Sequence, residues 1–138
     1  MSVTLILITH NKVGENMLQM ATETFGSTPL ETLVISVAPT DTSDEIMTQL
    51  LHFLKQSDCS DGVLILTDIY GSTPSNTACR LLPSQRFEII SGLNLPMLLK
   101  IFNYADSPLS QLTLCALQGG RDGIIHCNRD ICQPRVKG

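Results

Sequence analysis

Two side chains capable of acid–base chemistry follow apolar runs in this sequence. His10 comes after Leu5-Ile6-Leu7-Ile8-Thr9, and Asp68 comes directly after Gly62–Thr67. Continuous apolar runs of this length are typical of strands buried on both faces. In an open parallel sheet, ligands bind beyond the carboxyl ends of the strands, next to the point where the strand order reverses. If the two runs are neighbouring strands, His10 and Asp68 therefore face one crevice.

A carboxylate beside an imidazole has a specific chemical use. The carboxylate accepts the proton on one ring nitrogen and so fixes the tautomer. The other ring nitrogen keeps a free lone pair, which is the arrangement of a nucleophile. The same carboxylate stabilises a ring that has gained a group and a positive charge. Each residue also has a simpler interpretation, His10 as a structural hydrogen-bonding residue and Asp68 as a turn former.

The loop that follows Asp68 indicates what the nucleophile could carry. Gly71 permits a tight turn, and Ser72 and Thr73 supply hydroxyl donors. The loop runs into a helix N-terminus, where free N–H groups favour an anion. A histidine beside such a loop predicts a phosphoryl group carried on His10. Neither the Walker A pattern nor the Rossmann glycine fingerprint is present.

The elements that must position these residues alternate along the chain. Apolar runs predict strands at 3–8, 32–37, 62–67 and 86–91, and helical spacing predicts helices at 14–25, behind a capping box at 42–45, and at 75–82, 96–104 and 109–118. Residues 119–122 read as a turn. We expect an α/β fold, a doubly wound and mainly parallel sheet covered by helices on both faces. The order 2-1-3-4 is assumed, and residues 123–125 are compatible with a short antiparallel edge strand.

Length and composition limit the classes of function. The 138 residues are 43% hydrophobic with a net charge of −4, which fits one domain, expected at 1–125, followed by a tail at 126–138. The acidic balance argues against a nucleic-acid binder. The N-terminal apolar run is too short to insert into a membrane. Five irregularly spaced cysteines favour free thiols in a reducing cytoplasm.

No metal or cofactor is expected. His126, Cys127 and Cys132 are the closest approach to a ligand cluster, and they are too few at the wrong spacing. His52 reads as a solvated surface residue. Near the predicted crevice, Leu93, Asn94 and Pro96 could form a weak partner-binding surface, whereas a packing role is at least an equal alternative for neighbouring Leu95 and Met97.

Several of these pieces occur together in a pattern that resembles the IIA component of the mannose-family, phosphoenolpyruvate-dependent sugar phosphotransferase system. The matching segments, in family order over residues 3–125, are Thr9-His10, Gly62–Asp68, Gly71–Asn76, Ser91–Leu98 and Gly120–Gly123. The ordered set is specific although no single piece is.

The resemblance implies a phosphotransferase with a phosphohistidine intermediate. His10 would accept a phosphoryl group from the carrier protein HPr and pass it to a histidine on a IIB partner. Asp68 would orient His10, and Thr73 with its neighbouring amides would contact the phosphoryl group. The family fold has a final antiparallel strand, and the family commonly forms homodimers. Because the sequence stops at Gly138, we expect the IIB partner to be a separate protein or to be absent.

Two residues beside the predicted site depart from the family pattern. Asn11 and Ser72 stand where the family usually has glycine. Asn tolerates a positive φ better than most residues, so Asn11 could keep the turn, whereas Ser72 could tighten the loop or add a donor. Three other functions stay open: a regulatory module whose partner reads the phosphorylation state of His10, a phosphocarrier for dihydroxyacetone kinase, and an unphosphorylated structural domain.

Overall fold

A computed structural model of the chain describes residues 2–132. Its elements in chain order are β1 (Thr4–His10), α1 (Val13–Phe25), β2 (Thr32–Val37), α2 (Ser43–Gln56), β3 (Val63–Thr67), α3 (Thr73–Cys79), β4 (Phe87–Ser91), α4 (Leu95–Asn103) and α5 (Leu109–Asp122). The four strands form one sheet of order β2-β1-β3-β4, and every neighbouring pair is parallel. The predicted α/β fold and its strand order are confirmed.

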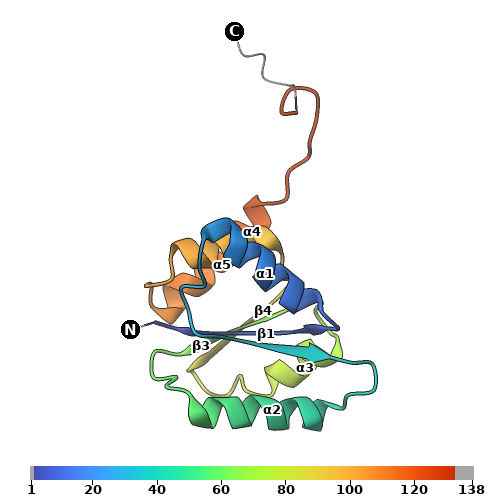
Figure 1. The fold of residues 1–138 in the computed structure, drawn as a ribbon, viewed down its shortest axis with the longest axis vertical. Helices are drawn as coiled ribbons and strands as arrows, with labels where there is room; N and C mark the ends of the chain where they lie inside the picture. Colours follow the sequence, from blue (N-terminus) through green and yellow to red (C-terminus); the bar gives the residue numbers. More distant parts are fainter. Residues whose placement is uncertain (1, 133–138) are drawn as a thin grey trace.

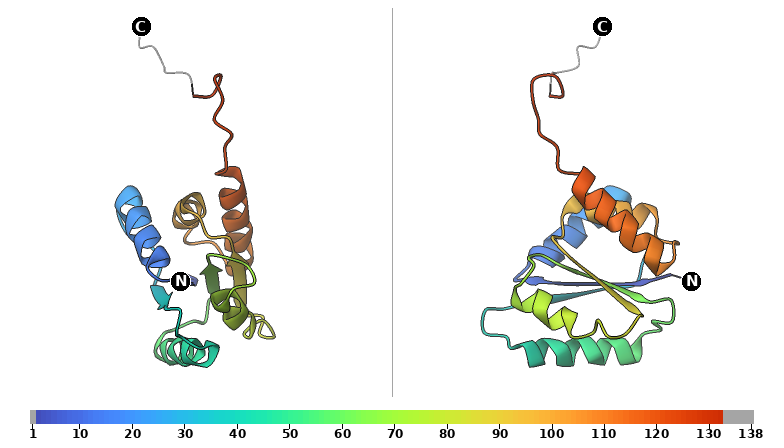
Figure 2. Two further views of the ribbon diagram at one scale, coloured as in Figure 1. Left: turned by 90° about the vertical axis from the view of Figure 1, so that its right-hand side faces the viewer. Right: turned by 180° about the vertical axis from the view of Figure 1, so that it is seen from behind.

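Helices cover both faces of the sheet (Figure 1). Helices α1, α4 and α5 lie on one face, and α2 and α3 lie on the other, as the rotated views also show (Figure 2). Successive residues of β1 serve the two layers in turn: Leu5 and Leu7 pack with the first group of helices, whereas Ile6 and Ile8 pack with the second. This double burial explains why the central strands are continuously apolar.

Two predicted helix signals act as expected. The Thr42 hydroxyl accepts a hydrogen bond from the Glu45 amide at 3.2 Å and donates one to the Glu45 carboxylate at 3.1 Å, so it caps α2. Gly26 follows α1 with φ 104°, and its N–H donates to the Thr22 carbonyl, which is the usual left-handed helix stop.

Three elements differ by two or more residues from their predicted bounds. Strand β1 continues through His10, because His10 pairs with Val37 of β2. Helix α3 begins two residues early, at Thr73, since Ser72 adopts the extended conformation of an N-cap. The same helix ends at Cys79, three residues before the predicted end. Helix α5 continues through the predicted turn at 119–122, because its glycines pack against α4: a Cβ on Gly119 would lie 2.5 Å from the Cβ of Lys100.

The short edge strand predicted at 123–125 does not form within the described residues. After α5 the backbone extends away from the body of the protein (Figure 2), and no strand follows β4 in the part of the chain that is described. The side chains of Ile124 and Ile125 are 78% and 60% exposed.

A tight turn joins β1 to α1 and sets the position of His10. The Thr9 hydroxyl accepts a hydrogen bond from the Gly14 amide at 2.7 Å, and a Cβ on Gly14 would lie 2.8 Å from that hydroxyl oxygen. Asn11 has φ 46° and is the one non-glycine residue with a positive φ among those described. Its N–H still donates to the Val37 carbonyl at 2.9 Å. Asn11 thus keeps the turn, as predicted.

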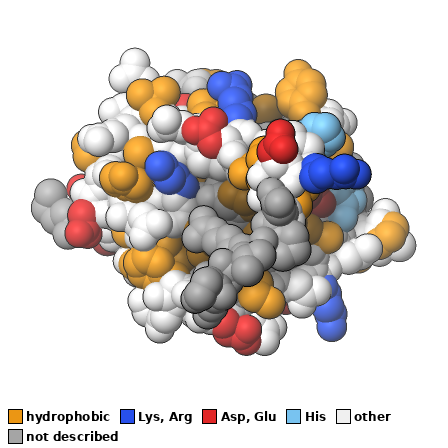
Figure 3. All heavy atoms as spheres, turned by 90° about the horizontal axis from the view of Figure 1, so that it is seen from above, with side chains coloured by type: hydrophobic (Ala, Val, Ile, Leu, Met, Phe, Trp, Pro, Cys, Tyr) orange, Lys and Arg blue, Asp and Glu red, His pale blue; other side chains and the backbone are white. Residues whose placement is uncertain are grey.

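On the helical face seen in Figure 3, basic, acidic and hydrophobic side chains are interspersed. Within residues 2–132, none of the helices combines the length and the hydrophobicity that crossing a bilayer would demand.

The left-handed backbone of Asn11 yields a stability prediction. Asn11→Val should lower the free energy of unfolding by about 1–2 kcal/mol, because a left-handed conformation brings Cβ close to the next carbonyl oxygen. Asn11→Gly should change it by less than about 0.5 kcal/mol. Urea denaturation measures both. Lys12→Val is the matched control, since Lys12 has φ −96°, and equal losses at positions 11 and 12 would contradict the explanation.

Candidate functional site

The carboxyl ends of the two central strands bring His10 and Asp68 together. His10 is the last residue of β1, Asp68 follows β3, and these strands are direct neighbours in the sheet. The imidazole Nδ1 lies 2.9 Å from Asp68 Oδ2, although the residues are 58 positions apart. The sequence-predicted pair is therefore in contact, at the edge of the sheet where ligands bind in this class of fold.

The carboxylate of Asp68 is fixed by more than the imidazole. Its Oδ2 also accepts a hydrogen bond from the backbone N–H of His10 at 3.0 Å, and its Oδ1 accepts one from the Ile69 amide at 3.1 Å. The Asp68 side chain is 11% exposed, whereas the His10 side chain is 43% exposed. The carboxylate is thus held in place behind a ring that reaches solvent.

The hydrogen bonds to Asp68 favour its ionised form. Burial raises the pKa of this carboxyl, but the bonds from the His10 backbone and ring outweigh burial and leave the pKa below its ordinary value. An ionised carboxylate can only accept hydrogen bonds. The imidazole proton is accordingly assigned to Nδ1, and Nε2 is the ring nitrogen left with a lone pair.

The loop between β3 and α3 lies next to this pair. Gly71 has φ 83°, a conformation that glycine adopts without strain. The Ser72 hydroxyl donates to the Ile69 carbonyl at 2.6 Å, and the Asn76 side chain donates to the Gly71 carbonyl at 3.2 Å. Ser72 has φ −84°, so its backbone does not require glycine. Of the two proposed roles for Ser72, tightening the loop is the one that its geometry fits.

Thr73 is the hydroxyl residue of this loop that faces solvent. It is exposed and opens α3, and within residues 2–132 its hydroxyl makes no hydrogen bond comparable to that of Ser72. Helix α3 is short, and Pro74 in its first turn has no N–H. The backbone donors here are therefore the individual amides around Thr73 rather than a full helix terminus.

Two of the three predicted partner-binding residues serve the fold. Leu93 is 6% exposed. The Asn94 side chain accepts a hydrogen bond from the Met97 amide at 2.9 Å and donates one to the Gly120 carbonyl at 3.0 Å. It thereby caps α4 and ties it to α5. Pro96 is half-buried.

Sequence reasoning missed two exposed side chains directly after Asp68. Ile69 is 59% exposed and Tyr70 is 83% exposed. The available signal was an aliphatic and an aromatic residue inside an otherwise polar, glycine-containing turn, where solvated positions usually hold polar residues. The guanidinium of Arg80, the residue after α3, pairs with the Asp44 carboxylate at 3.1 Å.

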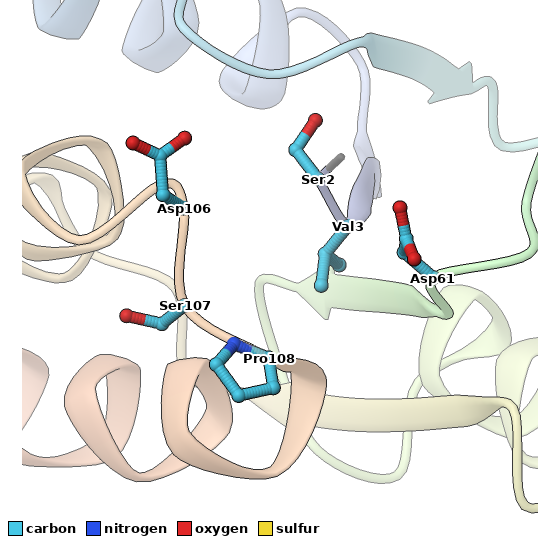
Figure 4. A pocket seen from close by; sticks show the side chains of 6 residues that line it. All are labelled: Ser2, Val3, Asp61, Asp106, Ser107 and Pro108. Carbon is cyan, nitrogen blue, oxygen red and sulfur yellow. The ribbon is translucent and has the colours of Figure 1, made fainter.

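A separate hollow lies at the opposite edge of the sheet. Its lining consists of Ser2, Val3, Asp61, Asp106, Ser107 and Pro108 (Figure 4). Val3 and Asp61 precede β1 and β3, so this hollow lies away from the His10 site. Among the described residues, no group of three or more His, Cys, Asp or Glu side chains could hold a metal ion.

Comparison with known proteins identifies relatives of this chain. The sequence matches the EIIA-man family, described as "PTS system fructose IIA component", over residues 4–115. The PTS system mannose-specific EIIAB component of Escherichia coli (strain K12) is 28% identical over 127 residues, which cover 90% of this chain and 39% of that protein. The chain thus matches well under half the length of such relatives.

Solved structures share the fold. The mannose/sorbose specific IIA subunit of the phosphotransferase system from Enterococcus faecalis superimposes with a TM-score of 0.83 at 21% identity, covering 99% of this chain and 100% of that one. The component EIIA from Streptococcus agalactiae gives 0.78 at 20% identity, covering 90% and 96%. At such low sequence identities, the similarity to these structures shows the fold alone. The family match extends from β1 into α5 and includes both His10 and Asp68, and the chain belongs to the EIIA-man family of phosphotransferase-system IIA components.

Proposed function

We propose that this chain is a phosphoryl carrier of the phosphotransferase system, with His10 as the residue that is phosphorylated. The donor is the phosphohistidine of HPr, and the acceptor is a histidine of a IIB partner. The observation that supports this most strongly is the 2.9 Å contact between His10 Nδ1 and Asp68 Oδ2, because it leaves Nε2 free and facing away from the carboxylate.

The transfer uses the lone pair of Nε2. This nitrogen attacks phosphorus, an N–P bond forms on His10, and the bond between phosphorus and the donor histidine breaks with its electron pair returning to that donor ring. The His10 ring gains positive charge while it retains the proton on Nδ1. Asp68, already ionised and hydrogen-bonded to Nδ1, stabilises that charge without moving.

Gly71, Ser72 and Thr73 are the residues proposed to bind the phosphoryl group. Thr73 offers an exposed hydroxyl and a backbone amide. Ser72 takes part through its amide, because the amide donates to the Ile69 carbonyl over 3.4 Å, a weaker hydrogen bond than the 2.6 Å bond from its hydroxyl to the same oxygen. Gly71 permits the turn that brings these groups beside His10. Transfer between two histidines is nearly thermoneutral, so alignment of donor and acceptor and exclusion of water are the main requirements.

Partner proteins would approach the exposed ring across the surrounding surface. Exposed Ile69 and Tyr70, with half-buried Pro96, form its apolar part. Leu93 and Asn94 contribute by holding the adjacent turn. We place the protein in the cytoplasm, where HPr would supply the phosphoryl group.

Phosphate labelling tests the carrier role. After incubation with phosphoenolpyruvate, enzyme I and HPr, the protein should gain one acid-labile phosphoryl group, measured by mass spectrometry. His10→Ala should abolish the label, because it removes the nucleophile. His52→Ala is the matched control and should retain it, since His52 lies on an exposed part of α2.

An unlabelled wild-type protein, with enzyme I and HPr shown to be active, would refute the carrier role and favour a structural domain. A labelled protein that passes no phosphoryl group to any IIB protein would indicate the regulatory alternative. Transfer to a dihydroxyacetone kinase subunit would indicate the kinase phosphocarrier.

Substitution of Asp68 tests the orienting role. Asp68→Asn should slow phosphorylation of His10 by about tenfold or more, since a hydrogen bond to a charged group contributes about 1.5–3 kcal/mol and 1.36 kcal/mol corresponds to a factor of ten in rate. Quenched-flow labelling measures this rate. Asp44→Asn is the control, because Asp44 pairs with Arg80. Equal rates for wild type and Asp68→Asn would remove Asp68 from the mechanism.

We further propose that the protein forms a homodimer. Strand β4 is an edge of the sheet, and exposed Ile124 and Ile125 lie on the segment that extends from α5. Unpaired edges and exposed apolar side chains favour association. Light scattering should give the mass of a dimer for the wild type and a lower mass for Ile124→Asp/Ile125→Asp. A monomeric wild type would contradict the proposal.

A further inference from the structure

Three hydroxyl side chains form a connected group beneath the active-site loop. The Thr67 hydroxyl lies 2.6 Å from the Ser91 hydroxyl, and the Ser75 hydroxyl lies 3.1 Å from the same oxygen. Thr67 and Ser75 are 0% and 1% exposed, respectively. Ser91 is half-buried. Ser91, the last residue of β4, therefore connects Thr67 at the end of β3 to Ser75 in α3.

The group holds both ends of the loop that contains the site residues. Thr67 immediately precedes Asp68, and Ser75 lies two residues after Thr73. The carbonyl of Thr67 also accepts hydrogen bonds from the amides of Gly92 and Leu93, each at 3.0 Å. Side chain and backbone of Thr67 are therefore both bonded to the turn after β4.

The position of the group in the sheet relates it to His10. Thr67 pairs in register with Ile8 on one side and with Ser91 on the other. Ile8 belongs to the apolar layer beneath α2 and α3. At the carboxyl ends of β3 and β4, the hydroxyls of Thr67 and Ser91 take the place of apolar side chains in that layer. Alternation along β1 sends the His10 side chain to the same face. Apolar packing would tolerate several loop positions here, whereas paired hydroxyls specify one arrangement.

We propose that Thr67 and Ser91 are positioning residues, whose linked hydroxyls hold Asp68 and Thr73 in register with His10. They touch neither the phosphoryl group nor its donor. Their effect on phosphoryl transfer rests on the proposed function, but their effect on the imidazole does not. Two measurements therefore separate the claims: the ¹⁵N chemical shifts of the His10 ring in the unphosphorylated protein, and the rate of phosphorylation by phosphorylated HPr.

Thr67→Val removes the hydroxyl and keeps the shape of the side chain. We expect it to lower the phosphorylation rate by about twofold to twelvefold, the range for loss of one hydrogen bond, and to shift the ring from the Nδ1-protonated tautomer towards a mixture. Ser91→Ala should have the same or a larger effect, because it removes the contacts to both Thr67 and Ser75. The double variant should resemble Ser91→Ala, because both substitutions act on one network.

Two matched variants distinguish positioning from general stability. Thr4→Val alters another buried threonine, 2% exposed, at the opposite end of the sheet, and should leave tautomer and rate unchanged. Thr67→Ser keeps the hydroxyl and removes only the methyl group, so it should retain the wild-type tautomer and rate. Denaturant midpoints of all variants show whether stability alone explains any loss.

The proposal is overturned if Thr67→Val and Ser91→Ala have the same tautomer and the same phosphorylation rate as Thr4→Val. That result would leave the carrier function intact. If HPr does not label the wild type, the carrier function fails, and the tautomer measurement alone decides: a shift supports positioning of the ring, and unchanged ring shifts overturn it.

Discussion

The contact between His10 and Asp68 depends on one feature of the sheet, the adjacency of β1 and β3. Only this strand order brings together two residues 58 positions apart and lets one carboxylate oxygen accept bonds from both the ring and the backbone of His10. Two helical layers bury the central strands so completely that their ends are fixed points. Residues directly after these strands are therefore held in fixed positions.

Much of this arrangement could be predicted from the sequence. Continuous apolar runs interrupted by helical spacing are sufficient to predict a parallel, doubly covered sheet. The strand-end positions of His10 and Asp68 predict a shared crevice only together with the assumed strand order. Boundaries were harder, because they depend on tertiary contacts. Gly119 and Gly120 look like turn residues in sequence, yet they allow α5 to approach α4 closely. The hydroxyl contacts of Thr67, Ser75 and Ser91 join three segments, so no local pattern could indicate them.

The two departures from the family pattern illustrate different physical solutions. At Asn11 the backbone does require a left-handed conformation, and the side chain is one of the few that tolerate it. At Ser72 the backbone is extended, and the side chain contributes a hydrogen bond inside the loop. A residue type that differs from a family pattern is therefore informative only together with the backbone conformation at that position.

The double hydrogen bond to Asp68 Oδ2 has a consequence for molecular encounter. The same oxygen accepts hydrogen bonds from the backbone and the ring of His10, and together these two bonds favour one orientation of the side chain. Ordering a flexible side chain during association costs about 0.5–1.5 kcal/mol in lost conformational entropy. Here that loss would occur on folding, so any protein that docks at this site would meet an imidazole already held by Asp68.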